Sequence, residues 1–103
     1  MTLERLDQLY WLNKEIDMDT RRLKEPGAAD IRTILEDKRA RCIQERDVLE
    51  AYIAAIDDDF TRQVFIYRFA EGLPWKLTAA YMGGQNTSNS IRMLVYRYIA
   101  KTA

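Results

Sequence analysis

The stretch that decides the fold is residues 73–100, LPWKLTAAYMGGQNTSNSIRMLVYRYIA. Proline is tolerated in a first helical turn, because an amide there would have no intrahelical partner, so a short helix is expected over 74–82. Gly83 and Gly84 then supply a stop with access to positive φ. Three polar residues that can cap a following helix come next: Asn86, Thr87 and Ser88. The break therefore predicts a turn between two helices.

The helix after this turn has one apolar face. Apolar residues recur at i, i+3, i+4 and i+7, the spacing of a buried helical face. They are Ile91, Leu94, Val95 and Tyr98. The outward residues are Asn89, Ser90, Arg92, Met93, Tyr96 and Arg97, and the first four are the expected base readers. Arg can pair with guanine and Asn with adenine in the major groove, whereas the alternative is a solvated amphipathic helix with no ligand.

A further helix is expected before this pair, from Asp59 to Glu71, with Gly72 ending it. The acid run 57–59 is expected to stabilise its start through the helix dipole, because consecutive carboxylates on a helix point in different directions and cannot share a metal. Arg62 and Arg68 are expected at the surface, either contacting phosphate or solvated. The expected buried set is Phe60, Val64, Phe65, Tyr67 and Phe69.

The run 58–98 resembles the region 4 helix-turn-helix of sigma factors, and more closely the short sigma-like proteins of prophages and mobile elements in Gram-positive bacteria. The matching positions are Arg62, Tyr67, Arg68, Gly72, Trp75, Ala79, Gly83, Ser88 and Ile91. Two features depart from that pattern: Thr78 stands where Ile or Val is usual, and the turn GGQNTS is longer. The resemblance implies a regulator of transcription whose partners are double-stranded DNA and, as a second candidate, RNA polymerase.

Charge is divided unevenly along the chain, although 16 basic and 16 acidic residues give a net charge of zero. Residues 60–103 carry a net charge of +5 and residues 1–59 a net charge of −5. Such asymmetry marks one basic interaction surface, while the acidic half discourages indiscriminate coating of DNA. The expected phosphate contacts are Lys76, Thr87, Ser88, Arg97 and Lys101.

Two long helices are expected before residue 57. The first spans about 3–24 and has a heptad-like seam of Leu6, Leu9, Asn13, Ile16, Thr20 and Leu23. Pro26 and Gly27 then interrupt the chain. The second spans about 29–56 and repeats apolar residues every seven positions, at Leu35, Cys42, Leu49 and Ile56. Two such helices joined by a short turn predict an antiparallel hairpin.

The seam of the second helix also contains charged residues, Lys38 and Glu45. Either their stems reach outward to water or a second copy of the hairpin completes the core. A homodimer through residues 3–56 is expected, because two-fold symmetry doubles the contacts of a small DNA reader. Trp11 is expected to cover a partner helix rather than bind a ligand, and a plain structural spacer is the simpler alternative for this half.

Catalysis is not expected. The chain has no His, its one cysteine, Cys42, has the register of a core thiol, and its only serines lie at positions 88 and 90. The glycine-containing turn lacks the preceding strand and the lysine of a P-loop. We expect no catalytic residue, metal or cofactor. Without a signal segment or a long apolar run, a cytoplasmic, nucleoid-associated protein that contacts no membrane is expected.

The sequence therefore predicts an all-α chain of about five helices. A coiled-coil-like hairpin over 1–56 serves as an oligomerisation or partner arm, and a three-helix helix-turn-helix domain covers 57–103. The expected function is sequence-specific DNA binding by a sigma region 4-like transcriptional regulator. The alternative is a coiled-coil interaction protein, or a DNA-packaging component of a phage or mobile element, whose helix-turn-helix serves mainly for packing.

Overall fold

The computed structural model describes residues 1–27 and 29–103, and every regular element within these ranges is helical. The α-helices are α1 (Leu3–Leu6), α2 (Leu9–Leu23), α3 (Arg32–Ala54), α4 (Asp59–Phe65), α5 (Trp75–Met82) and α6 (Ser88–Lys101). A 3-10 turn, η1 (Ala29–Ile31), precedes α3, and a π-helical segment, η2 (Ile66–Ala70), follows α4. The predicted all-α class, with a hairpin followed by a helix-turn-helix, is confirmed.

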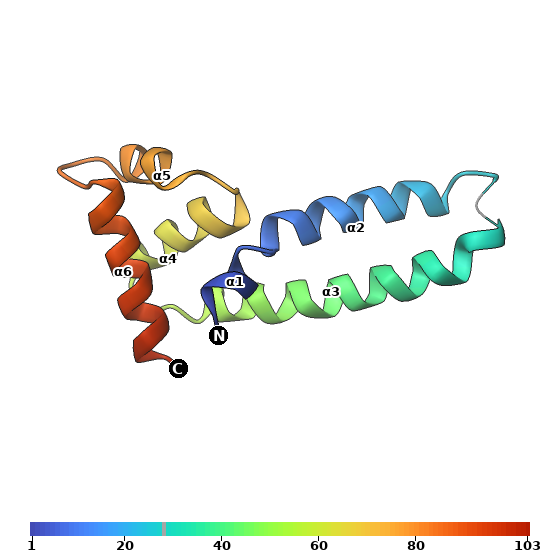
Figure 1. Ribbon diagram of the computed structural model, residues 1–103, viewed down its shortest axis with the longest axis horizontal. Helices are drawn as coiled ribbons and strands as arrows, with labels where there is room; N and C mark the ends of the chain where they lie inside the picture. The colour runs from blue at the N-terminus through green and yellow to red at the C-terminus, as the bar shows by residue number, and fades with distance from the viewer. Residues whose placement is uncertain (28) are drawn as a thin grey trace.

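Helices α2 and α3 form an antiparallel hairpin, here called the arm, that projects from the remaining helices (Figure 1). It makes the molecule elongated, with principal extents of 53 × 27 × 19 Å. The buried seam of the arm contains Ile16 from α2 and Leu35 and Leu49 from α3. Cys42, which the heptad placed in the core, is half-buried.

The first predicted helix is bent rather than continuous over 3–24. Thr2 caps α1 by accepting the amide of Arg5 at 3.2 Å, and the helix ends at Leu6 before α2 begins at Leu9. Both Leu6 and Leu9 are fully buried in the core. The bend thus lets the N-terminal turn lie against the core as well as the arm.

The charged residues of the predicted seam are paired within one chain. Lys38 Nζ lies 3.0 Å from a carboxylate oxygen of Asp19 and 3.1 Å from one of Glu15. Arg5 Nε donates to Glu45 at 2.9 Å. Hydrogen bonds to Asp19 and then to Glu15 raise the pKa of Lys38. The charged residues of the seam therefore have partners within one chain, so the polar seam does not by itself require a second copy.

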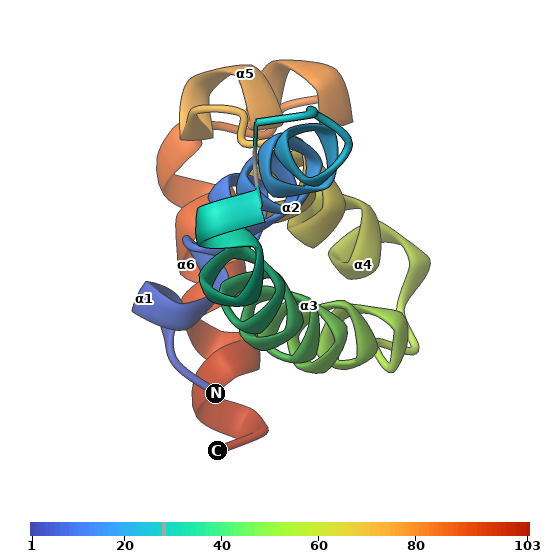
Figure 2. The same ribbon diagram turned by 90° about the vertical axis from the view of Figure 1, so that its right-hand side faces the viewer.

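One core joins the base of the arm to the helix-turn-helix. Its fully or largely buried members are Leu6, Leu9, Leu49, Ile53, Ile56, Val64, Phe65, Phe69, Ala79, Ile91 and Val95. The ring centroid of Phe65 lies 5.4 Å from those of both Phe69 and Tyr98. Seen along the arm, α4 and α6 lie on opposite sides of it and α5 crosses above (Figure 2). Shared burial therefore fixes the arm to the helices that follow.

The segment expected as one helix over 59–71 changes its hydrogen bonding midway. The amide of Glu71 donates to the carbonyl of Ile66 at 2.9 Å, which is the i to i−5 pattern of a π-helix, and Gly72 then takes a φ of 71°. At the start of this segment Asp58, a member of the acid run, caps α4 by accepting the amide of Thr61 at 2.9 Å. The hydroxyl and amide of Thr61 lower the pKa of Asp58.

Two apolar residues in this half of the chain are exposed, and one of them, Phe60, was predicted to lie in the core. Leu77 is 43% exposed and Phe60 is 37% exposed. On α5 the buried side is set by Thr78 and Ala79, and Leu77 lies about 160° from Ala79 around a helix that turns about 100° per residue. Phe60 occupies the first turn of α4, whereas the buried residues of that helix begin with Thr61.

Candidate nucleic-acid interface

Helix α5 contains a buried threonine, Thr78, at the position where sigma-like proteins usually have Ile or Val. Thr78 is fully buried, and its hydroxyl donates to the carbonyl of Pro74 at 3.0 Å. The hydroxyl is therefore satisfied within the helix, and Thr78 can be buried beside Ala79 without an unpaired polar group. Gly83 and Gly84 have φ values of 74° and 66°, which confirms their predicted role in the turn.

The start of α6 is closed by a reciprocal cap. Thr87 Oγ1 accepts the amide of Ser90 at 3.1 Å, and Ser90 Oγ accepts the amide of Thr87 at 2.9 Å. Ser90 Oγ also donates to the carbonyl of Thr87 at 3.0 Å. Thr87 was one of the expected phosphate contacts and Ser90 one of the expected base readers, and both hydroxyl oxygens take part in the cap that holds the helix start. Ser88, between them, is half-buried.

The outward side of α6 carries three neutral side chains in one row. Asn89, Met93 and Tyr96 are spaced i, i+4 and i+7, so they share one face of the helix. All three are exposed, Met93 by 39% and Tyr96 by 41%. We call this row the α6 strip. The opposite face is inward as predicted, since Ile91 and Val95 are buried.

Cations border the α6 strip on both sides. With about 100° of rotation per residue, Arg92 lies about 60° from Asn89 in one direction and Arg97 about 80° from it in the other. Arg92 is half-buried, and its Nη2 donates to Asn89 Oδ1 at 3.1 Å. Arg97 is exposed, and Lys101 follows it one turn further along. The structure thus brings two expected base readers, Asn89 and Arg92, into contact. It places Arg97, an expected phosphate contact, on the opposite side of the α6 strip.

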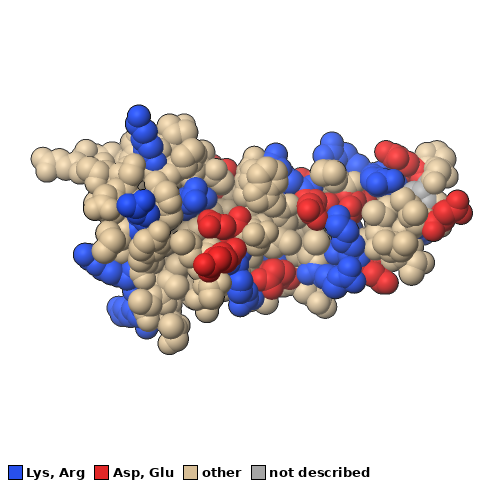
Figure 3. Space-filling model, in the orientation of Figure 1, with Lys and Arg blue, Asp and Glu red and all other residues tan. Residues whose placement is uncertain are grey.

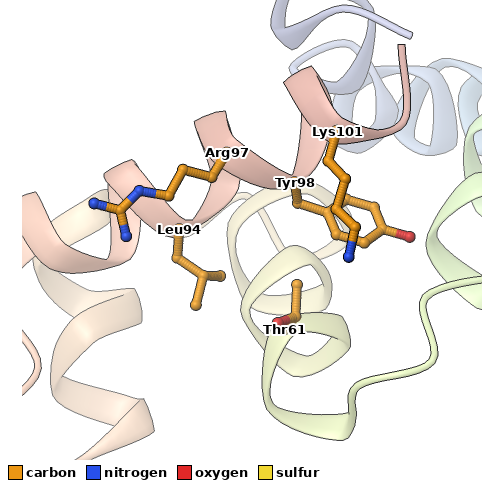
Figure 4. A pocket seen from close by; sticks show the side chains of 5 residues that line it. All are labelled: Thr61, Leu94, Arg97, Tyr98 and Lys101. Atoms are coloured by element: carbon orange, nitrogen blue, oxygen red, sulfur yellow. The ribbon is translucent and has the colours of Figure 1, made fainter.

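Arg97 and Lys101 line a pocket of about 230 Å³ between α6 and α4 (Figure 4). Leu94 and Tyr98 of α6 and Thr61 of α4 complete its lining. Thr61 Oγ1 already donates to Asp58 at 2.7 Å, and the charged donors of the pocket are Arg97 and Lys101. Burial, followed by the nearby Tyr52 and Asp57, raises the pKa of Tyr98. The side chain of Tyr98 therefore lines the pocket in its uncharged form at physiological pH.

The end of the molecule that contains α5 and α6 is poor in acids. Residues 72–103 contain no Asp or Glu, and their four cations are Lys76, Arg92, Arg97 and Lys101. Lys76 is exposed in the first turn of α5, separate from the pocket. In the face shown in Figure 3, acidic side chains appear from the base of the arm to its tip, while the α5 and α6 end shows basic ones.

Two arginines that were candidates for phosphate contact have structural partners instead. Arg68 donates to the carbonyl of Leu73 at 3.0 Å and stacks on Trp75, with its guanidinium carbon 4.5 Å from the ring centroid. Arg62 donates to the carbonyl of Ile56 at 2.6 Å and pairs with Asp59. Both hold connections between helices, a role that no periodic pattern in the sequence could indicate.

No protein-family model, curated protein or solved structure significantly matches the chain. The resemblance to sigma-factor helix-turn-helix proteins stays a prediction from the motif residues. In the described part of the chain, no helix is both long and apolar enough to cross a membrane. The same residues bring together no cluster of three or more His, Cys, Asp or Glu side chains suited to a metal ion.

Proposed function

We propose that the chain is a sequence-specific DNA-binding transcriptional regulator, like sigma region 4, whose helix α6 reads the major groove. The observation that carries this proposal is the exposed, neutral α6 strip between Arg92 on one border and Arg97 on the other. An α-helix fits the major groove, and cations beside it can pair with the phosphates that line the groove. The absence of carboxylates from 72–103 leaves nothing there to repel those phosphates.

Each group has a distinct role in this proposal. Asn89, Arg92 and Met93 contact base edges, which specify the sequence. Lys76, Arg97 and Lys101 contact phosphates, and these contacts position the protein. The backbone amide of Ser88 adds a donor at the start of α6, whereas the amide of Thr87 is already bonded to Ser90 Oγ. The arm extends away from the end of the molecule that contains α6 (Figure 1), so its acidic residues stay away from a duplex bound at α6.

The arm supports the second part of the proposal, a homodimer through residues 3–56, with RNA polymerase as a further partner. Four large apolar side chains on the arm are exposed: Trp11, Met18, Ile34 and Val48. Trp11 and Met18 are one heptad apart on α2, so they lie on one stripe, and Ile34 and Val48 are likewise two heptads apart on α3. These stripes equally favour the second candidate function, an interaction protein that uses the arm to bind another protein.

The proposal is tested by fluorescence anisotropy with a labelled random-sequence duplex at several salt concentrations. The wild type should bind, and its affinity should fall as salt rises. The triple variant K76A/R97A/K101A should flatten the slope of log affinity against log salt by about three, one for each lost contact. The matched control R21A/R22A/R41A removes three exposed arginines from the arm and should keep the slope.

Two results would contradict DNA binding through this surface. The first is a wild-type protein that binds no duplex at low salt. The second is an equal loss of slope in the α5/α6 variant and in the arm variant, which would mean that charge alone, without a defined surface, governs binding. Either result would favour the interaction-protein function.

A further inference from the structure

We propose that α6 selects sites that contain A·T pairs, with Asn89 hydrogen-bonded to an adenine and Met93 against a thymine methyl group. This inference rests on the proposed function, because α6 must first enter the major groove. It extends the proposed function by naming the class of base pair that the α6 strip recognises.

The side chain of Met93 is the first reason. It stands 39% exposed in the middle of the strip, one turn from Asn89, where it packs against nothing in the core. The C5-methyl of thymine is the apolar group that base edges present in the major groove. A flexible thioether adapts well to such a contact. Tyr96 extends the apolar surface, and its ring meets Trp75 edge-on with centroids 6.4 Å apart.

The amide of Asn89 is the second reason. To bind adenine it must accept from the N6 amino group and donate to N7. Arg92 Nη2 occupies one lone pair of Asn89 Oδ1 at 3.1 Å and leaves the other lone pair and both N–H donors of the amide. The bond also restricts rotation of the amide. Arg92 is therefore a positioning residue for Asn89 in addition to any base contact of its own.

The other side chains near the α6 strip offer little for reading further bases. Ser90 Oγ, which could contact any base, is held in the cap with Thr87. Cytosine is read through its amino group by Asp or Glu, and residues 72–103 contain neither. The bordering Arg97 matches the charge of the phosphates on one edge of the groove. Duplex DNA with adenine and thymine at the strip is the occupant that fits.

The test begins with selection of the preferred duplex from a random pool by the wild-type protein. Each thymine of that duplex is then replaced by uracil, which removes the methyl group and keeps base pairing. Each adenine is replaced in turn by 7-deazaadenine, which removes the N7 acceptor. Dissociation constants are measured for the wild type, M93A, N89A and the control F60A, which truncates an apolar side chain of similar exposure on α4, outside both the α6 strip and the arm.

At one or more thymines, uracil should weaken wild-type binding about fourfold, as expected for one buried methyl group, and should leave M93A binding unchanged. At one adenine, 7-deazaadenine should weaken the wild type at least about fivefold and have no effect on N89A. F60A should respond as the wild type does. Circular dichroism should show native helix content in all variants, because positions 89 and 93 are exposed.

The inference is overturned if no thymine in the selected site is sensitive to uracil, or if M93A keeps the full sensitivity. A selected site made only of G·C pairs would overturn it as well. These outcomes leave DNA binding itself intact. A wild type that binds neither the random nor any selected duplex would instead overturn the proposed function, and this inference with it.

Discussion

The ring of Tyr10 lies directly against Gly72, so closely that a Cβ added at Gly72 would come within 2.7 Å of Tyr10 Cγ. Tyr10 belongs to α2, whereas Gly72 lies in the turn between η2 and α5. Gly72 also has a φ of 71°, a conformation that side chains rarely adopt. A glycine at this position therefore meets two separate requirements where the arm joins the helix-turn-helix.

The variant G72A should consequently be less stable than G83A. Gly83 has a similar φ of 74°, but a Cβ there would meet nothing within 4 Å. G83A should lower the free energy of unfolding by about 1–3 kcal/mol through the backbone alone, because a ψ of −167° places Gly83 in a region that only glycine readily adopts. G72A should lower it by a further 1–3 kcal/mol, roughly the cost of overpacking. Urea denaturation measures both.

Two controls separate these causes. G27A, at an open position without positive φ, should change the free energy of unfolding by less than about 0.5 kcal/mol. Adding Y10A to G72A should recover part of the loss, because the ring is then absent. Equal losses in G72A and G83A would show that Tyr10 yields without cost.

The variant K38A should destabilise the arm, because it removes a cation from beside the buried Asp19, whose side chain is 4% exposed. We expect the free energy of unfolding to fall by about 1–3 kcal/mol, the cost of leaving a buried polar group without its partner. The control E36A breaks an exposed ion pair with Arg32 and should cost less than about 1 kcal/mol. A smaller loss in K38A than in E36A would contradict the assignment.

This contribution of Lys38 should also depend on pH. Its pKa in the folded chain is raised by Asp19 and Glu15, so its stabilising effect is complete below the unfolded pKa of about 10.4 and disappears as pH rises through the higher folded value. The difference in stability between the wild type and K38A should therefore shrink only in strongly alkaline solution.

The variant D58A should lower the melting temperature near neutral pH, because it removes the cap of α4. Bonds from Thr61 lower the pKa of Asp58, so the stabilisation is present above the unfolded pKa of about 3.9 and is lost as pH falls through the folded value. Thermal melts from pH 7 to pH 2 should show the wild type and D58A converging in acid. D57A, which removes a neighbouring exposed carboxylate outside the cap, should show no such convergence.

The variant R92A should differ from K76A and R97A in DNA binding. R92A should cost about 1–3 kcal/mol on the preferred duplex and much less on random DNA, because Arg92 borders the bases and orients Asn89. K76A and R97A should weaken both duplexes alike and flatten the salt slope by about one each. Equal losses on both duplexes for all three variants would make Arg92 a phosphate contact.

The arm should associate in solution through its exposed apolar stripes. Sedimentation equilibrium at tens of micromolar should give a dimer for the wild type and a monomer for W11A/I34A, since each change removes a large side chain more than half exposed. M93A, on α6, is the matched control and should remain dimeric. A wild type that sediments as a monomer would remove the homodimer from the proposal.

Features that depend on near neighbours in the chain were predictable. The turn at Gly83 and Gly84, the cap of α6 and its inward face are all set by residues within a few positions of one another. Local hydrogen bonds and helical periodicity decide such features, so the all-α class and the exposed side of α6 followed from the sequence. The expected base readers Asn89 and Met93 lie on that exposed side.

By itself, then, the sequence determined where helices form and which side of α6 faces outward. Only the tertiary structure decided how remote side chains are used. Lys38 meets Asp19 across the arm, Arg68 stacks on Trp75, and Tyr10 packs on Gly72. Residues far apart in sequence come into contact only when the shared core orients the helices, so no local pattern could indicate these pairs.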